Sequence, residues 1–407
     1  MSERSRPPSI DTLAVQAGSR THAAGKAASA VPAIEPSVGF VHPAMHDTDE
    51  ALGYEGGTPF DPDMYVYSRY GGPTQSQFEE AVAAVEGAEA AMSFASGMAA
   101  LHAAVLSLVV PGSTIVAAEQ LYGVTRTLLD WLGANLHVQV RYVDFLDLDA
   151  VQRAVADARP VCVMCEVLTN PLVRVIEMDR IAAIAHDVDA VLLVDNTFAT
   201  PFLLRPLDRG ADVVVHSTTK FLNGHGDVLG GVLAGPVDVV QQAYRHRRVL
   251  GAMPSAFDAW LALRGLRTLA VRMRQACHNA QRIAEWLQAD ERIGRVYYPG
   301  LAADAGHEAA RRLFGGEHFG SVLAFELAGL DRAGAFHFVE SLELIKPVTS
   351  LGDVYSIILH PASASHRALS AEEREAQGIT EGVLRLSVGI EGVDDLIADL
   401  EGALAVV

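Results

Sequence analysis

Residues 212–227 read DVVVHSTTKFLNGHGD, and they are the most informative part of the chain for its architecture. Its first part, Val213 to His216, is a short run without charge, as expected of a strand that is buried on both faces. Further runs of this kind precede it and alternate with helical patterns, at residues 113–117, 138–143, 161–165 and 191–194. Apolar strands that alternate with helices predict a mostly parallel sheet covered on both faces, which is an α/β doubly wound architecture.

The pattern along the chain predicts three parts. Residues 1–72 are rich in Pro, Gly, Ala and Ser and have weak periodicity, so we expect an extended N-terminal arm. Residues 73–265 hold the alternating pattern and form the predicted large domain. Residues 266–407 follow a long helical zone and mix strands with helices, which predicts a smaller α+β domain.

The bulk composition narrows the class of protein. The chain has 407 residues, half of them hydrophobic, which is enough for a large core. A formal net charge of −19 argues against extended nucleic-acid binding, which needs a basic surface. The N-terminal segment lacks the apolar region of a signal peptide, and no stretch approaches the roughly 18 apolar residues that span a bilayer. We therefore expect a cytoplasmic protein that binds neither membranes nor nucleic acids.

The cysteines and histidines do not suggest a disulfide framework or a metal site. Cys162 and Cys165 form a C-x-x-C pattern inside the apolar run 161–165, where residues three apart point to opposite faces of a strand. With Cys277 they make an odd, sparse set, which we interpret as buried packing residues. The fifteen histidines are scattered, without the clustering of a zinc site.

Polar side chains follow three of the predicted strands. Glu166 follows the run at 161–165, Asp195 follows 191–194, and Lys220 comes shortly after Val213 to His216. Ligands bind beyond the carboxyl ends of the strands in open α/β sheets, so two acids and an amine are expected to meet there. Lys220 is also one of only three lysines, with Lys26 and Lys346. A lysine placed after a buried strand suits Schiff-base chemistry, whereas the plainer interpretation is a surface lysine in a loop.

A second feature suggests an anion site. Ser96 and Gly97 open a helical pattern, and small residues at a helix N-terminus present backbone N–H groups to a phosphate. The hydroxyls of Ser217 and Thr219 could bind the same phosphate, although a lone Ser-Gly pair is more often an ordinary helix cap. The glycine-rich run 222–231 lacks the G-x-G-x-x-G spacing, so a dinucleotide site is not predicted.

With these motifs, the chain resembles the Cys/Met-metabolism family of pyridoxal 5′-phosphate (PLP) enzymes, which includes cystathionine γ-synthases, cystathionine γ-lyases, methionine γ-lyases and O-acetylhomoserine sulfhydrylases. The resemblance runs from residues 12–18, TLAVQAG, to residues 385–391, RLSVGIE, and is most specific at 212–227. It implies the fold type I of PLP-dependent, aminotransferase-like transferases, with a mostly parallel sheet and a smaller C-terminal domain. It also implies PLP as the cofactor and a homotetramer built from two dimers that share their active sites.

The resemblance implies a role for each residue that matches a family motif. Lys220 would carry PLP as a Schiff base and move protons, Asp195 would pair with the pyridinium nitrogen, and Tyr122 would stack on the ring as an acid or base. Asn170 would contact the ring hydroxyl. The phosphate would be held by Gly97, Met98, Ser217 and Thr219, and by Tyr67 and Arg69 of a neighbouring subunit. The substrate would meet Arg385 and Ser350 at its α-carboxylate, and Tyr67, Val124 and Thr349 nearby.

Several positions depart from the patterns of the family. Val66 and Thr349 stand where some cystathionine lyases carry glutamates, which favours a substrate with a neutral tail. Val124 replaces the cysteine of typical methionine γ-lyases, and Arg247-Arg248 replace their usual Lys-Asp; both differences argue against a specialised methionine γ-lyase. The departures together suggest a changed pocket rim, and the others are Gly72, Gln75, Val167, Leu168 and Tyr355.

Three functional hypotheses follow from the resemblance. The first is γ-elimination or γ-replacement on a sulphur-containing or O-acylated four-carbon amino acid, as in a methionine γ-lyase, a cystathionine γ-synthase or a sulfhydrylase. The second is β-elimination from cystathionine or cysteine, or γ-lyase action on a non-sulphur amino acid in secondary metabolism. The third is a PLP-binding protein without turnover, against which the complete set of Lys220, Asp195, Tyr122 and Arg385 argues.

Overall fold

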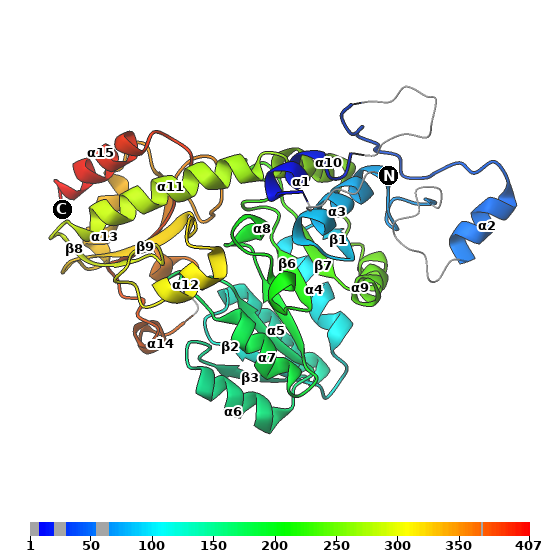
Figure 1. Cartoon of the computed structure of the whole chain (residues 1–407), viewed down its shortest axis with the longest axis horizontal. Coiled ribbons are helices and arrows are strands. Elements are labelled where there is room, and N and C mark those ends of the chain that lie inside the picture. The colour runs from blue at the N-terminus through cyan, green and yellow to red at the C-terminus, as the bar shows by residue number, and fades with distance from the viewer. Residues whose placement is uncertain (1–7, 20–29, 54–64, 368) are drawn as a thin grey trace.

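The structure is a computed structural model that describes residues 8–19, 30–53, 65–367 and 369–407 (Figure 1). Its centre is a seven-stranded sheet with the strand order β1-β7-β6-β5-β4-β2-β3. The strands are β1 (Ala90–Phe94), β2 (Thr114–Ala118), β3 (Gln139–Val143), β4 (Cys162–Glu166), β5 (Val191–Asp195), β6 (Val213–His216) and β7 (Gly231–Gly235). Strands β6, β5, β4, β2 and β3 pair in parallel, and β7 is antiparallel to both of its neighbours. The predicted mostly parallel sheet is confirmed.

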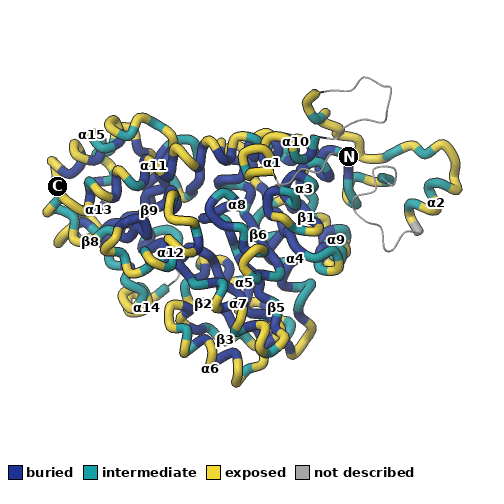
Figure 2. The backbone as a smooth tube through the Cα atoms, in the orientation of Figure 1, coloured by how far each residue is buried: buried dark blue, intermediate teal, exposed yellow. Residues whose placement is uncertain are grey.

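Helices cover both faces of this sheet. They are α3 (Pro73–Glu86), α4 (Gly97–Leu108), α5 (Gly123–Leu136), α6 (Leu148–Ala158), α7 (Met178–His186), α8 (Thr200–Leu203), η1 (Pro206–Arg209), α9 (Val237–Leu250) and α10 (Ala256–Leu266). Helices α3, α4 and α9 pack on β1 and β7, whereas α5, α6 and α7 pack toward β2 to β5. Every residue of β1, β4, β6 and β7 is buried, and Figure 2 shows the strands as the dark interior beneath partly exposed helices.

The sequence pattern located β2 to β6 to within about a residue but missed β1 and β7. These two strands read AAMSF and GVLAG, and small residues favour strands only weakly. Close packing explains the small residues, because a Cβ added at Gly231 would lie 2.2 Å from the carbonyl oxygen of Ser96. The start of α4 can therefore approach β7 only where the strand has no side chain.

A second sheet follows in the C-terminal part, with the order β10-β11-β12-β9-β8. Its strands are β8 (Ile293–Tyr297), β9 (Val322–Leu327), β10 (Lys346–Pro347), β11 (Ile357–Leu359) and β12 (Val383–Ser387). It is accompanied by α11 (Leu269–Gln288), α12 (His307–Phe314), α13 (Arg332–Glu340), η2 (Pro361–Ser363), α14 (Ala371–Ala376) and α15 (Val393–Leu404). This agrees with the α+β pattern, and the predicted boundary at 265/266 falls at the end of α10; the domain limits stay a prediction.

The long helical zone is broken between α10 and α11, close to the loop that carries Lys220. A Cβ at Gly265 would lie 2.2 Å from the carbonyl oxygen of Asn223, so the helix can pass this loop only with a glycine there. Arg272 of α11 then donates hydrogen bonds to the carbonyl oxygens of Phe221, at 2.8 Å, and of Gly265, at 2.9 Å. The break thus fixes the chain just after Lys220.

The described parts of the N-terminal arm are α1 (Ile10–Gln16), α2 (Met45–Gly53) and the segments beside them. Helix α1 packs on α3 and α11, whereas Figure 1 shows α2 away from the body of the molecule. The contribution of the arm to a neighbouring subunit stays a prediction. Among the described residues, no helix combines the length and apolar character needed to cross a bilayer.

Candidate functional site

A cavity of about 610 Å³ lies at the carboxyl ends of β4, β5 and β6. It is also lined from the C-terminal part, by residues of β12, β11 and the loop between β10 and β11. The predicted site residues that line it are Gly97, Met98, Tyr122, Asn170, Asp195, Ser217, Thr219, Lys220, Thr349, Ser350 and Arg385. The structure therefore brings together residues that are spread over most of the chain.

Lys220 reaches the cavity from a turn that follows β6 directly. Its Nζ donates a hydrogen bond of 2.9 Å to Oγ of Ser350. Burial, and next the positive charge of Arg385, lower the pKa of Lys220 from 10.5 to about 8. Of the other two lysines, Lys346 lies over the ring of Tyr355, and Lys26 is outside the described residues. Lys220 is thus the described lysine whose amine lines the cavity and is readily deprotonated.

Two carboxylates stand side by side at the ends of neighbouring strands. Glu166 and Asp195 are paired residues in the register of β4 and β5. Burial, and next the charge of Asp195, raise the pKa of Glu166 well above its ordinary value. Burial also raises the pKa of Asp195, against hydrogen bonds from Thr197 and the charge of His216. An acid here can pair with a cation in the cavity, which is the role expected of Asp195.

His216, on the neighbouring strand, forms a buried pair with Glu86. Its Nε2 lies 2.5 Å from Oε1 of Glu86, and both side chains are fully buried. The same carboxylate oxygen accepts a hydrogen bond from the side-chain amide of Asn196, at 3.4 Å. This buried pair is a group that the sequence pattern did not reveal, because Glu86 lies 130 residues from His216.

The first turn of α4 forms a cradle for an anion. Oγ of Ser96 accepts the N–H of Ala99 at 3.1 Å, which leaves the N–H groups of Gly97 and Met98 at the open end of the helix. A Cβ at Gly97 would lie 2.8 Å from Cβ of Ser217, so the hydroxyl of Ser217 stands against this helix end. The hydroxyl of Thr219 also lines the cavity, but it exchanges hydrogen bonds of 3.0 and 3.2 Å with the backbone of Gly230.

Arg385 of β12 presents a buried cation to the same cavity. Its side chain donates to Oδ1 of Asn170, at 2.8 Å, and to the carbonyl oxygen of Ser350, at 2.9 Å. Both acceptors are neutral, and no described carboxylate forms an ion pair with Arg385. Its Nε is buried without a hydrogen-bond partner among the described residues. An uncompensated buried cation is costly, which points to an anion supplied by the substrate.

Asn170 and two residues that the sequence pattern missed complete this end of the site. The side-chain oxygen of Asn170, expected at a ring hydroxyl, is occupied by Arg385. The ring of Phe198 lies 6.0 Å from the guanidinium of Arg385. His366 is buried nearby, where burial, and next the charge of Arg385, lower its pKa to about 4. No local motif marks Phe198 or His366, because they meet Arg385 only through the packing of distant segments.

Tyr67, Arg69 and Val124 lie outside the cavity of the single chain. All three are exposed, and Nη1 of Arg69 donates to the carbonyl oxygen of Arg248 at 2.5 Å. Arg247, which departs from the pattern of methionine γ-lyases, is buried in an ion pair with Glu79, at 2.7 Å. The roles of the three exposed residues in a neighbouring subunit stay predictions.

Comparison with known proteins gives consistent matches over nearly the whole chain. The family described as Cys/Met metabolism PLP-dependent enzyme matches residues 11–405. An O-succinylhomoserine sulfhydrylase of Pseudomonas aeruginosa is 39% identical over 97% of this chain and 95% of its own length. An L-methionine gamma-lyase of Fusobacterium nucleatum subsp. polymorphum is 39% identical over 84% of this chain and 86% of its own. The structure of cystathionine gamma synthase from Xanthomonas oryzae pv. oryzae in complex with cystathionine is 38% identical, with a TM-score of 0.90 and 98% of both chains covered.

Proposed function

Because this chain belongs to the Cys/Met metabolism family of PLP-dependent enzymes, we propose that it catalyses γ-replacement or γ-elimination on a sulphur-containing or O-acylated four-carbon amino acid. The family establishes a PLP-dependent enzyme of the trans-sulfuration type that acts on small amino acids. The specific activity is the proposed part, since the relatives carry different names.

The residues of the cavity fit PLP. The open end of α4, with Gly97 and Ser217, suits a phosphate, and Asp195 suits a protonated ring nitrogen. Bound at Lys220, PLP supplies an electron sink for carbanion chemistry at the amino acid. Lys220 can hold or release a proton at Nζ near neutral pH, because its pKa is about 8. Tyr122, 38% exposed, lines the same cavity as a second acid or base.

One observation carries the proposal: Ser350 contacts both Lys220, the amine expected to bind PLP, and Arg385, the cation expected to bind the substrate carboxylate. Its hydroxyl accepts from Nζ of Lys220 at 2.9 Å, and its carbonyl oxygen accepts from Arg385 at 2.9 Å. An α-carboxylate bound at Arg385 would thus hold the Cα proton of an amino acid close to the amine of Lys220. Positioning of this kind is a large part of enzymatic rate enhancement.

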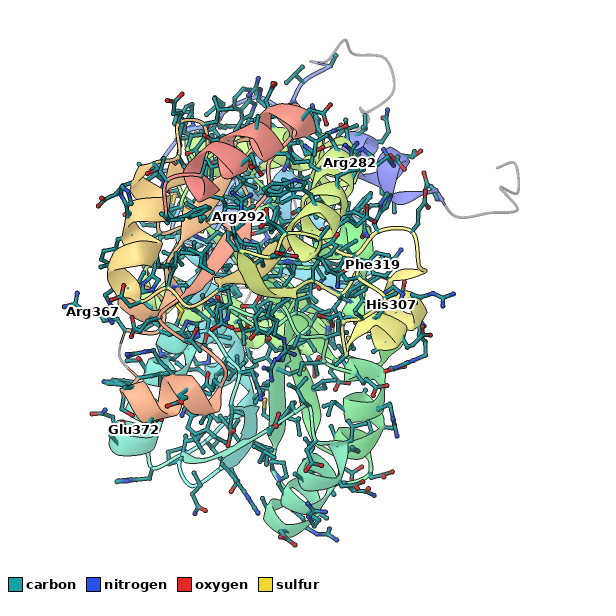
Figure 3. All side chains as sticks on the ribbon, turned by 90° about the vertical axis from the view of Figure 1, so that its left-hand side faces the viewer. Arg282, Arg292, His307, Phe319, Arg367 and Glu372 are labelled. Carbon is teal, nitrogen blue, oxygen red and sulfur yellow. The ribbon has the colours of Figure 1, made fainter. Side chains whose placement is uncertain are left out.

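The lining of the cavity supports a substrate with an uncharged leaving arm. The described acids that line it are Glu166 and Asp195, both at strand ends, whereas Thr349 and Leu359 line the opposite side. Arg367 contributes to the rim, but Figure 3 shows its side chain extending outward from the molecule. A distal ammonium would find no described carboxylate at this rim. These features favour methionine or O-acetylhomoserine, whose leaving arms are uncharged, over cystathionine.

The test uses the purified enzyme with PLP and four substrates: methionine, O-acetylhomoserine, O-succinylhomoserine and cystathionine, each with and without a thiol. We expect 2-oxobutyrate from elimination, or a thioether when the thiol replaces the leaving group. Lys220→Ala, under the same conditions, controls for turnover by other proteins. Pyruvate as the main product would instead indicate β-elimination, and the absence of every product with all four substrates would refute the proposal.

We also propose that the active form is a homo-oligomer, with a tetramer as the expected state. Tyr67 and Arg69 are exposed and stand outside the cavity of their own chain, as expected of residues that serve another subunit. Val249 and Leu250, at the end of α9, have apolar side chains that are 81% and 56% exposed. They follow Arg248, whose carbonyl oxygen accepts the hydrogen bond from Arg69. Light scattering of the purified protein measures this state, and a monomer with full activity would contradict it.

A further inference from the structure

Glu166 is the acid of the cavity to which the proposed reaction gives no role. It ends β4, it is 7% exposed, and it lines the cavity beside Asp195. The residues before it in the strand, Val163 to Cys165, are apolar or uncharged. A carboxylate in this place is costly to bury, and the raised pKa of Glu166 reflects that cost. Packing alone would be served better by an apolar residue.

The carboxylate of Glu166 holds the start of helix α5. The backbone N–H of Tyr122 donates to its Oε1 at 2.6 Å. Tyr122 is the N-cap residue of α5, directly before Gly123, and its own side chain does not cap the helix. The N-terminal N–H groups of a helix need acceptors, and negative charge is favourable there. Glu166, which comes from a different element, therefore fixes the backbone from which the Tyr122 ring projects into the cavity.

The same carboxylate holds the turn after β4. The backbone N–H of Asn170 also lies near the carboxylate of Glu166 and acts to lower its pKa. The side chain of Asn170 in turn accepts from Nη1 of Arg385 at 2.8 Å. Glu166 thereby joins two sides of the cavity: Tyr122 on one side, and Arg385 through Asn170 on the other.

We propose that Glu166 is a positioning residue that sets the ring of Tyr122 and the guanidinium of Arg385 at a fixed separation across the PLP site. The inference rests on the proposed function for the roles of Tyr122 and Arg385. Glu166 acts through its contacts with the backbone of Tyr122 and of Asn170. Its effect is expected on the orientation of bound PLP and on the affinity for an amino-acid carboxylate.

The test compares two variants of the full-length holoenzyme. Glu166→Met keeps the volume of the side chain but removes both acceptor oxygens, whereas Glu166→Gln keeps one acceptor oxygen. We expect Glu166→Met to reduce the visible circular dichroism of bound PLP at least twofold and to raise KM for the amino acid about tenfold or more. Glu166→Gln is expected to recover part of both losses, since it can still accept from Tyr122.

Asp212→Asn is the matched control. The carboxylate of Asp212 also accepts a backbone N–H from a neighbouring strand, that of Leu192 at 2.7 Å, but Asp212 precedes β6 and so lies at the opposite ends of the strands from Glu166. The variant Asp212→Asn should lower the thermal unfolding midpoint without changing the circular dichroism of bound PLP or the KM for the amino acid. If Glu166→Met lowers the unfolding midpoint but leaves both of those quantities at wild-type values, Glu166 is structural and the inference is wrong.

The circular dichroism of bound PLP separates this inference from the proposed function. It is measured without substrate, so it reports the placement of Tyr122 even if none of the four amino acids is turned over. Titration of the apoprotein with PLP gives a second readout of the same kind, and Glu166→Met should weaken PLP binding severalfold. Wild-type circular dichroism and PLP affinity in Glu166→Met would overturn the inference while leaving the reaction proposal untouched.

Discussion

Replacing Arg385 with methionine should move the pH at which the amine of Lys220 becomes reactive. Burial, and next the charge of Arg385, lower the pKa of this amine from 10.5 to about 8. At pH 7.5, these values leave roughly a quarter of the amines neutral instead of about one in a thousand, a gain of roughly two-hundred-fold in reactive amine. Arg385→Met removes the charge of Arg385, the smaller of the two causes, but leaves the burial. The pKa of Lys220 should therefore rise but stay below 10.5.

The assay follows the rate at which the apoprotein binds PLP covalently, as a function of pH. Only the neutral amine is a nucleophile, so the rate should increase with pH and level off above the pKa of Lys220. We expect a midpoint near 8 for the wild type and a higher midpoint for Arg385→Met. Methionine is tolerable at this buried position because an unpaired cation is replaced with an apolar side chain.

Arg282→Met serves as the control, since Arg282 is about half exposed and pairs with Asp394 on the surface. Its rate profile should match that of the wild type. A wild-type midpoint near 10.5, or identical midpoints for the wild type and Arg385→Met, would refute the reasoning from burial and charge.

Further predictions test the stability, the anion cradle and the shared site. Arg247→Met should destabilise the protein by about 3–5 kcal/mol in denaturant unfolding, since it leaves a buried carboxylate unpaired; a loss below about 1 kcal/mol would contradict this. Gly231→Ala should weaken PLP binding at least tenfold in a titration, because the added Cβ would lie 2.2 Å from the carbonyl oxygen of Ser96; an unchanged affinity would count against the cradle. Mixing the inactive variants Arg69→Ala and Lys220→Ala should restore about a quarter of the wild-type activity if sites are shared between subunits, and none if each chain is self-sufficient.

The sequence pattern located most of the large sheet because its strands carry their signal locally. Strands β2, β4, β5 and β6 are apolar runs of four or five residues, bounded by polar residues. Strands β1 and β7 carry no such signal. They are strands because of their pairing and because α4 packs against residues without large side chains.

The residues of the candidate site also differ in how far local sequence predicts them. Lys220 and Asp195 could be predicted from the residues themselves, since each is polar and follows a buried strand. Ser350 lies 130 residues from Lys220, and Asn170 lies 215 residues from Arg385, so their contacts could be expected only from the resemblance to a family. The contacts of Glu166 with Tyr122, and the position of His366 beside Arg385, were not predicted at all.

The kind of sheet, the strand ends that carry an amine and an acid, and the family of the chain can all be recognised in the amino-acid sequence. The distant side chains that meet within hydrogen-bond distance, and therefore the pKa of Lys220 and the unpaired charge of Arg385, follow from the folded arrangement. This difference arises because strand and helix patterns are set by neighbours in the chain. Burial and electrostatic fields, in contrast, depend on every segment that packs around a group.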